Sequence, residues 1–343
     1  MIVTNLFQSI LRGKSGMNIG LPSGLPKVDS IIYGVQRRWM YVWAGDSGSG
    51  KSSIVLYSQI YRPIIESLKN PDINVHFLLF SFEMSAEVLF AKLLSLYIYE
   101  KYGKILSYGQ ILSLGDVLSD NDYKYVEASK PWLEKVESIC EVIDKPVTAK
   151  GLYAICKEWS KKFGTYIEEE VSEGYVKETY LPNDDKQYLI TVIDHMRLFS
   201  LSSGHNIKQE MDEACDYLIH FRNKCGFTVH AIQQLNRNFK SMERRNSENA
   251  LLGLEDLSDS GGPTQSAETV IAIYHPFREK RNKCEGYDIK VLKDRARLIQ
   301  ILKNRFGLAD RSVGCTFYGE VGLWRELPLP HEIQDYTKYI NLS

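Results

Sequence analysis

The sequence lacks the features of several protein classes. Its six cysteines form no C-x-x-C pair and have no histidine at zinc spacing, so we expect reduced thiols and no metal cluster built on them. No apolar run reaches the roughly 18 residues of a membrane-spanning helix, and the first twelve residues lack the basic start and apolar core of a signal peptide. We therefore expect no membrane association, no export and a cytoplasmic location.

An excess of charge of either sign is also missing. Lys and Arg number 42 against 43 Asp and Glu, which gives a formal net charge of −1. No global basic field draws such a chain onto nucleic acid, so any DNA binding must use a local surface or a ring of subunits. The 343 residues, 44% of them hydrophobic, are enough for one large α/β core with insertions.

What the sequence does contain is a phosphate-binding loop. Residues 45–53 fit G-x-x-x-x-G-K-[ST] and lie between the apolar run Trp39–Ala44 and the helix-compatible run Ile54–Ile60. In this strand–loop–helix order, backbone N–H groups surround an anion, Lys51 reaches the β- and γ-phosphates, and Ser52 ligates Mg²⁺. The residues predicted to bind ATP are Gly45, Asp46, Ser47, Gly48, Ser49, Gly50, Lys51, Ser52 and Ser53.

Further apolar runs predict a sheet whose strands alternate with helices. Buried strands are predicted at Val75–Ser81, Tyr188–Asp194, Phe227–Ile232, Thr269–Tyr274 and Leu298–Leu302, with a β-rich stretch from Val313 to Trp324. Helical patterns begin at Ser85 and cover Tyr123–Ile139, Lys150–Phe163 and the run from Ile207 to Gly226, and no strong strand is predicted within residues 100–187. This pattern predicts an α/β fold with a mostly parallel sheet and a C-terminal β-rich extension.

Three segments stand apart from the expected domain, residues 20–327. Residues 1–19 predict a short helix capped by Thr4, with apolar residues on one side, followed by a glycine-rich tether. This leader either docks on another surface or folds back on its own domain. Residues 165–186, which are acidic, predict a surface insertion, and residues 328–343 form a C-terminal tail.

Polar residues near strand ends are the candidates for chemistry. Asp194 closes a strand like the acid of a Walker B element, which holds Mg²⁺, although it could also be a cap. Glu83 could accept a proton from the attacking water or only favour a helix start, and Gln234 could sense the γ-phosphate. Lys303 and Arg305 lie two apart in a strand-like register, so they either face a neighbour's nucleotide or protect an edge strand.

These blocks together resemble the RecA-type ATPase domain of DnaB-family replicative helicases. The similar stretches occur in the family's order and cover roughly residues 18–327. They are the phosphate loop and residues 20–25, 81–87, 192–194, 234–237, 256–261 and 303–307, together with the single residues Asp29, Gln265 and Ala267. The resemblance implies a RecA-like fold and a ring, usually a hexamer, with ATP bound between subunits.

The resemblance also implies a role for each candidate residue. Lys51 and Ser52 hold phosphate and Mg²⁺, and Asp194 is the acid that binds the same magnesium ion. Glu83 is the catalytic base, and Gln234 couples the γ-phosphate to the DNA loops. Arg305 reaches into the neighbouring site as an arginine finger, with Lys303 as its partner. The residues assigned to single-stranded DNA are Arg237, Ser260, Gly261 and Gly262. The implied activity is ATP-driven movement on single-stranded DNA with 5′–3′ polarity that unwinds duplex DNA, and a primase or helicase loader is a possible partner.

The sequence departs from the family in several respects, and its phosphate loop is of a more generic form than usual. The amino-terminal helical domain of bacterial members is not present, Ser258 replaces the usual arginine in a channel loop, and the 165–186 insertion is unusual. This compact architecture suits a helicase of a phage or mobile element in a bacterial cytoplasm. Two alternatives stay open: a RecA-like ATPase that coats or remodels DNA without unwinding it, and a protein that uses nucleotide only to assemble.

Overall fold

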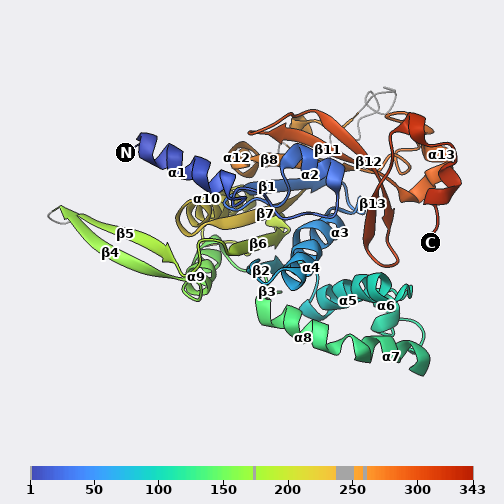
Figure 1. The fold of residues 1–343 in the computed structure, drawn as a ribbon, viewed down its shortest axis with the longest axis horizontal. Coiled ribbons are helices and arrows are strands. Elements are labelled where there is room, and N and C mark those ends of the chain that lie inside the picture. Colours follow the sequence, from blue (N-terminus) through green and yellow to red (C-terminus); the bar gives the residue numbers. More distant parts are fainter. Residues whose placement is uncertain (1, 173–174, 237–250, 258–260, 343) are drawn as a thin grey trace.

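The protein is built on a nine-stranded sheet with helices on both faces (Figure 1). The computed structural model describes residues 2–172, 175–236, 251–257 and 261–342. The strand order is β13-β12-β11-β8-β1-β7-β6-β2-β3, and the strands are β1 Met40–Gly45, β2 Val75–Ser81, β3 Cys140–Ile143, β6 Tyr188–Asp194, β7 Phe227–Gln234, β8 Thr269–Tyr274, β11 Ala296–Asn304, β12 Arg311–Tyr318 and β13 Leu323–Glu326. This architecture confirms the predicted α/β fold with its C-terminal β-rich extension.

The direction of the strands divides the sheet in two. The strands from β8 to β3 run parallel to one another, whereas β11, β12 and β13 pair antiparallel. Every residue of β1 and of β6 is buried, as expected for central strands covered on both faces. The carboxyl ends of the parallel strands therefore share one edge, with Gly45 paired to Gln234 and Ser81 paired to Asp194.

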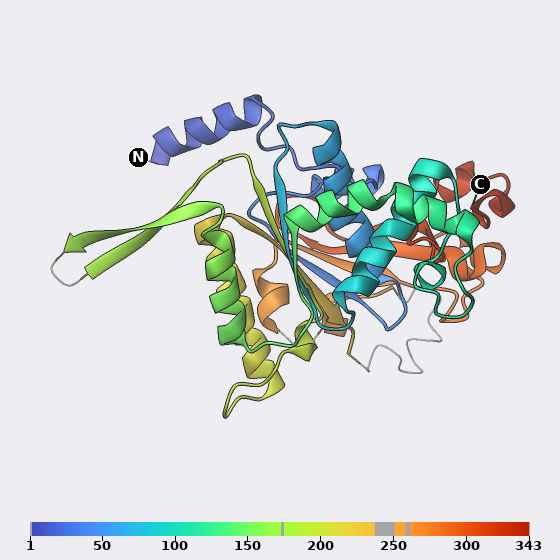
Figure 2. The same ribbon diagram turned by 90° about the horizontal axis from the view of Figure 1, so that it is seen from below.

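Helices cover the two faces with separate hydrophobic cores. The helices are α1 Ile2–Lys14, α2 Pro26–Ile32, α3 Lys51–Val55, which continues through the π-helical turn Leu56–Tyr61 into α4 Arg62–Lys69, α5 Ala86–Tyr102, α6 Tyr108–Ile111, α7 Asp120–Ala128, α8 Lys130–Ile139, α9 Ala149–Ser160, α10 Ile207–Cys225, α12 Gly261–Ser266 and α13 Ile289–Leu292. One core packs α9 and α10 on the sheet, and the other packs the helices from α2 to α5 (Figure 2).

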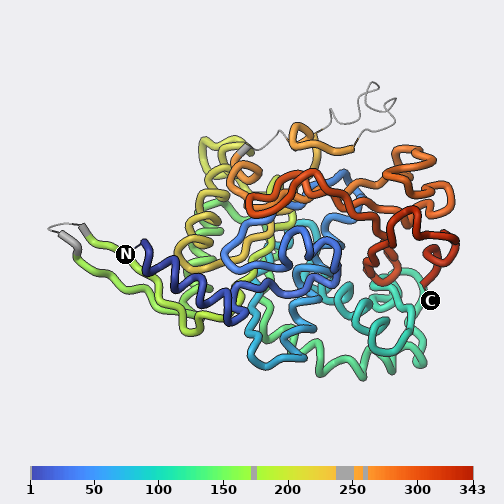
Figure 3. Tube along the Cα trace, turned by 45° about the horizontal axis from the view of Figure 1, so that its top comes forward, coloured from blue at the N-terminus to red at the C-terminus, as the bar shows by residue number. Residues whose placement is uncertain are grey.

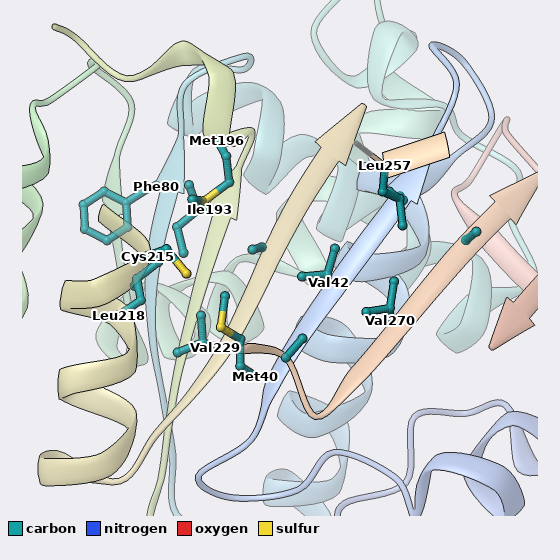
Figure 4. Packing of buried hydrophobic residues seen from close by; sticks show 14 of the residues in the cluster. Met40, Val42, Phe80, Ile193, Met196, Cys215, Leu218, Val229, Leu257 and Val270 are labelled. Atoms are coloured by element: carbon teal, nitrogen blue, oxygen red, sulfur yellow. The ribbon is translucent and has the colours of Figure 1, made fainter. Parts of the chain in front are cut away.

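The first core shows why the predicted apolar runs become strands. Val42 of β1, Val229 of β7 and Ile193 of β6 lie on the face that meets Cys215 and Leu218 of α10 (Figure 4). Alternate residues of the same strands, such as Tyr41 and Trp43, belong to the second core. Each strand thus buries both of its faces, which is the pattern of a continuous apolar run.

The prediction that residues 100–187 hold no strong strand is wrong. β3 is a parallel edge strand, and β4 Gly164–Ser172 pairs antiparallel with β5 Tyr175–Pro182 to form a hairpin. The sequence pattern did not predict β3 because that strand has only four residues, all half-buried. It did not predict the hairpin because the run of glutamates in β4 breaks the alternation expected of a strand. The hairpin extends from the body of the molecule on the same side as α1 (Figures 1 and 3).

The two ends of the chain differ in how they pack. α1 is a helix as predicted, but it begins at Ile2, so Thr4 lies inside it and is not its cap. No residue of α1 is buried, and six of its apolar side chains are exposed. The tail instead packs on the core, where the Tyr318 hydroxyl donates to the Tyr339 carbonyl at 2.9 Å. Within the described residues, no helix is both long and apolar enough to span a bilayer.

Candidate nucleotide site

The phosphate loop follows β1 at the carboxyl edge of the sheet. Gly48 and Gly50 adopt φ angles of 70° and 101°, which glycine accepts without strain, and α3 begins at Lys51. The buried Lys51 ammonium donates to the Asp46 carbonyl at 3.2 Å. Burial lowers the pKa of Lys51, and the carboxylates of Asp194 and Glu83 oppose this effect. The loop thus has the shape and charge of a phosphate cradle.

Asp194 ends β6 beside this loop and is almost completely buried. Burial raises its pKa to about 6, although a hydrogen bond from Ser52 and the charge of Lys51 lower it. Its Oδ1 atom is buried and has no hydrogen-bond partner among the described residues. A hydroxyl and an unpartnered carboxylate oxygen side by side fit Mg²⁺, which prefers oxygen ligands, and these are the two residues predicted to hold it.

Two more predicted residues lie next to the acid. Glu83 follows β2 in an exposed turn, and its charge acts on both Lys51 and Asp194. The Nε2 atoms of Gln234 and His195 lie 3.3 Å apart. The carboxyl ends of the four neighbouring strands β1, β7, β6 and β2 therefore bring Lys51, Gln234, Asp194 and Glu83 into one site.

His195 is a member of this site that the sequence reasoning missed. Its Nδ1 accepts a hydrogen bond from the Arg197 backbone N–H at 3.3 Å, and burial lowers the pKa of the ring. The neutral ring therefore carries its proton on Nε2, and the Gln234 amide can accept it by presenting its oxygen. The only signal in the sequence is that His195 directly follows Asp194.

Two arginines that the sequence reasoning left without a role hold the outside of the phosphate loop. Arg278 donates to the Ser47 carbonyl, and a methyl group on Gly48 would clash with its guanidinium. Arg297 is buried and donates through Nε to the Ser49 carbonyl at 2.8 Å. Burial lowers the pKa of Arg297 to about 10, so it stays charged. Both arginines bind carbonyls of the loop, which favours an orientation in which its N–H groups face a phosphate.

Lys303 and Arg305 lie at the other edge of the sheet. Lys303 donates to the Thr264 and Gln265 carbonyls at 2.9 and 2.7 Å, and Arg305 forms an ion pair with Glu268 at 3.1 Å. β11 ends at Asn304 with a register shift after Ile301, so the expected strand register does not continue to Arg305. Both cations still converge on Gln265, because Arg305 also donates to its carbonyl at 3.5 Å.

The residues predicted to bind DNA are only partly described. Arg237, Ser258 and Ser260 lie outside the described residues. Gly261 and Gly262 open α12, and a methyl group on Gly262 would meet Asp212 of α10 at 2.9 Å. The predicted contact of these glycines with DNA stays a prediction.

The chain is similar to known helicase domains in sequence and in fold. Residues 175–325 match the family described as DnaB-like helicase C terminal domain, which is less than half of the chain and leaves the phosphate loop outside. A DnaB-like replicative helicase, solved to show its interactions with primase, matches 90% of this chain and 64% of its own length at 18% identity and a TM-score of 0.64. A second solved structure, described as an ATPase domain, matches 95% of this chain and 98% of its own length at 19% identity and a TM-score of 0.67.

These similarities show the fold of the chain and the family that part of its sequence resembles. At such identities the solved structures show the fold alone, and this chain spans only 64% of the replicative helicase. No curated protein matches the sequence. The fold and the site are those of a RecA-like domain with a phosphate-binding loop. The sequence match places residues 175–325 with the DnaB-like helicases, which confirms the resemblance seen in the blocks at residues 192–194, 234–237, 256–261 and 303–307.

Proposed function

We propose that this chain is a replicative helicase of the DnaB type that hydrolyses ATP between the subunits of a ring, translocates on single-stranded DNA and unwinds duplex DNA. The family match and the assembled phosphate site support the ATPase part of this proposal. The observation that supports a ring is the position of Lys303 and Arg305. These two cations lie at the opposite edge of the sheet from the phosphate loop of their own chain.

Backbone hydrogen bonds show how far Arg305 lies from the phosphate loop of its own chain. The N–H of Arg305 donates to the Glu268 carbonyl at 2.8 Å, and the N–H of Glu268 donates to the Met40 carbonyl at 2.9 Å. Arg305 is therefore level with the first residue of β1, whereas the phosphate loop follows the last one. The six residues of β1 span roughly 20 Å at about 3.3 Å each, which is beyond the reach of one arginine side chain.

Arg305 is also available to a neighbouring subunit. Its side chain is 47% exposed, although its partner Glu268 is buried and also pairs with Arg222 at 2.9 Å. Arg305 can leave Glu268 without stranding that carboxylate, because Arg222 and the Met40 N–H remain bound to it. A guanidinium that reaches the γ-phosphate of the adjacent subunit contributes about 10³ to 10⁵ in turnover in enzymes of this kind.

The residues of one protomer then have distinct tasks in hydrolysis. Lys51 and the loop N–H groups bind the phosphates, and Glu83 accepts the proton of the attacking water. Gln234 contacts the γ-phosphate, and its contact with His195 couples the bound phosphate to the loop after Asp194. Ser52 and Asp194 would hold Mg²⁺, which neutralises phosphate charge when bound.

Several finer features belong to the same proposal. We infer a hexameric ring, Mg²⁺-dependent hydrolysis, 5′–3′ polarity and a primase or helicase loader as partner from the resemblance to DnaB-type helicases. The replicative helicase that matches in fold was solved with its interactions with primase as the subject, which supports a primase as the first partner to test.

Mixing two inactive variants tests the shared site. Lys51→Ala removes the phosphate lysine and Arg305→Ala removes the finger, so each variant alone should be inactive. In a 1:1 mixture, about a quarter of the interfaces combine an intact Lys51 with an intact Arg305, and ATP hydrolysis should recover toward that fraction. Assembly of each variant is checked by native mass measurement.

The outcomes of this experiment are separable. If both variants assemble and the mixture stays inactive, or if Arg305→Ala alone keeps wild-type turnover, the trans site is wrong. Unwinding is measured on a forked duplex with wild-type protein. Full DNA-stimulated ATP hydrolysis without strand separation would favour a remodelling ATPase over a helicase.

A further inference from the structure

A second cluster of ligand-type side chains lies between the loop that follows Asp194 and helix α10. His205 is at the end of that loop, and Glu210 and Glu213 are in the first two turns of α10. One potential ligand atom from each of the three residues lies within 4.8 Å of the other two. The nucleotide site uses none of them.

We propose that His205, Glu210 and Glu213 bind a divalent transition-metal ion, with Zn²⁺ as the best fit. The Nδ1 atom of His205 lies 3.0 Å from Oε2 of Glu210 and 3.6 Å from Oε2 of Glu213. Zn²⁺ binds nitrogen and oxygen at about 2.0–2.2 Å, so adjacent ligands of a tetrahedral site are about 3.3–3.5 Å apart. The two separations from His205 lie on either side of this value, and the two carboxylates offer ligand atoms within 4.8 Å of each other.

The two adjacent carboxylates of the cluster, Glu210 and Glu213, favour binding of a cation. Glu210 is completely buried, and Oε2 of Glu213 is a buried atom without a hydrogen-bond partner in the part of the chain that the structure describes. Among those same residues, neither carboxylate forms an ion pair with a lysine or an arginine. Two adjacent carboxylates, one of them fully buried, repel each other unless a proton or a cation lies between them.

Hydrogen bonds already orient the proposed ligands. Oε1 of Glu210 accepts from the Ala149 N–H at 2.6 Å, and its Oε2 accepts from the Ser202 N–H at 2.9 Å. The Ser202 hydroxyl also donates to Oε1 at 3.0 Å, so hydrogen bonds fix the position of both oxygens of this carboxylate. The Tyr217 hydroxyl donates to the other oxygen of Glu213 at 2.9 Å, which leaves Oε2 for the ion.

The chemistry of the set selects the ion. A histidine nitrogen with two carboxylates favours Zn²⁺, Co²⁺ or Mn²⁺ over Mg²⁺, which prefers oxygen ligands. His205 and Glu213 are partly exposed, so an ion can enter from solvent and a water can fill the fourth position. Because Glu210 also holds Ala149 at the start of α9, a bound ion would fasten the loop after Asp194 to both α9 and α10.

The experiment uses the full chain, stripped of metal with a chelator, in a titration with Zn²⁺ alone. We expect one ion per chain with micromolar or tighter affinity, and a rise in the thermal midpoint as Zn²⁺ is added. Glu213→Gln keeps the shape and the Tyr217 contact but removes the charged ligand, and it should weaken Zn²⁺ binding at least about tenfold. Asp216→Asn, an exposed carboxylate one turn further along α10, is the matched control and should bind like wild type.

Substitution with Co²⁺ gives a readout that needs no variant. Tetrahedral nitrogen and oxygen coordination gives strong visible absorption, whereas octahedral coordination by solvent gives almost none. The proposal is overturned if wild type binds Zn²⁺ no more tightly than millimolar, if Glu213→Gln binds as wild type does, or if Co²⁺ shows only the weak octahedral spectrum. Because this site is separate from the nucleotide site, none of these results bears on the proposed helicase activity.

Discussion

Replacing Asp194 by asparagine should stabilise the protein at neutral pH. Asp194 is a buried carboxylate whose folded-state pKa is raised from 3.8 to about 6. Between these two values the folded state binds more protons than the unfolded chain, so this group lowers stability as pH rises. The cost is complete above pH 6 and amounts to about 3 kcal/mol, because one pKa unit corresponds to about 1.4 kcal/mol. Asparagine does not titrate and avoids this cost.

The pH dependence separates this effect from a general change in packing. With the same two pKa values, the cost of the carboxylate is about 3 kcal/mol at pH 7.5 and about 1.5 kcal/mol at pH 5. Asp194→Asn should therefore be more stable than wild type by up to these amounts, and the advantage should halve on acidification. Urea denaturation followed by tryptophan fluorescence, without nucleotide or Mg²⁺, measures both values.

A control and an activity measurement complete the test. Asp216→Asn changes an exposed carboxylate and should stay within about 0.5 kcal/mol of wild type at both pH values. Asp194→Asn should also lose ATP hydrolysis, because it removes a proposed magnesium ligand. A variant less stable than wild type at pH 7.5, or an advantage that is equal at pH 5 and 7.5, would refute the idea that burial of this charge is costly. Such a charge is a case of function maintained against stability.

Three further predictions address the phosphate loop and the leader helix. Arg297→Met leaves buried carbonyls without a donor and should cost about 2–4 kcal/mol in urea denaturation, with at least tenfold weaker binding of a fluorescent ATP analogue. Gly50→Ala should abolish nucleotide binding, because its φ of 101° is strained for alanine and the methyl group would meet Trp324 at 2.8 Å, whereas Gly204→Ala, at φ 82° with open space, should cost only about 1 kcal/mol and keep binding. Deletion of residues 1–14 should change stability by less than about 1 kcal/mol, because α1 buries no residue, but should weaken ring assembly measured by native mass.

The sequence was sufficient for the parts of the fold that are buried on both faces. β2, β6 and β8 have the predicted bounds, because a continuous apolar run between turn residues allows few other structures. The β4–β5 hairpin was missed because neither strand pairs with the main sheet, and only Gly164 and Tyr180 are buried among its residues whose burial is described. Single-sequence patterns report burial, so segments that are stabilised mainly by backbone pairing stay invisible to them.

The candidate site divides in the same way. Lys51, Asp194 and Gln234 were found because each occupies a fixed place relative to a predicted strand. Arg297 was not, although it holds the phosphate loop, because its contact with Ser49 joins residues 248 positions apart and no local pattern marks it. His195 was overlooked for a different reason, since its partner Gln234 lies on another strand, and only the order of the sheet brings them together.

One reversal of chain direction underlies the shared site that we propose. The strands that carry Lys51, Asp194 and Gln234 run parallel, so their functional ends meet at one edge of the sheet. β11 pairs antiparallel with β8, so its first residues lie beside the phosphate loop, where Arg297 binds Ser49, and its last residues lie at the far edge. A parallel β11 would place Lys303 at the nucleotide of its own protomer. The observed direction places it at the far edge instead, so the role that we propose for Lys303 requires a nucleotide held by another copy.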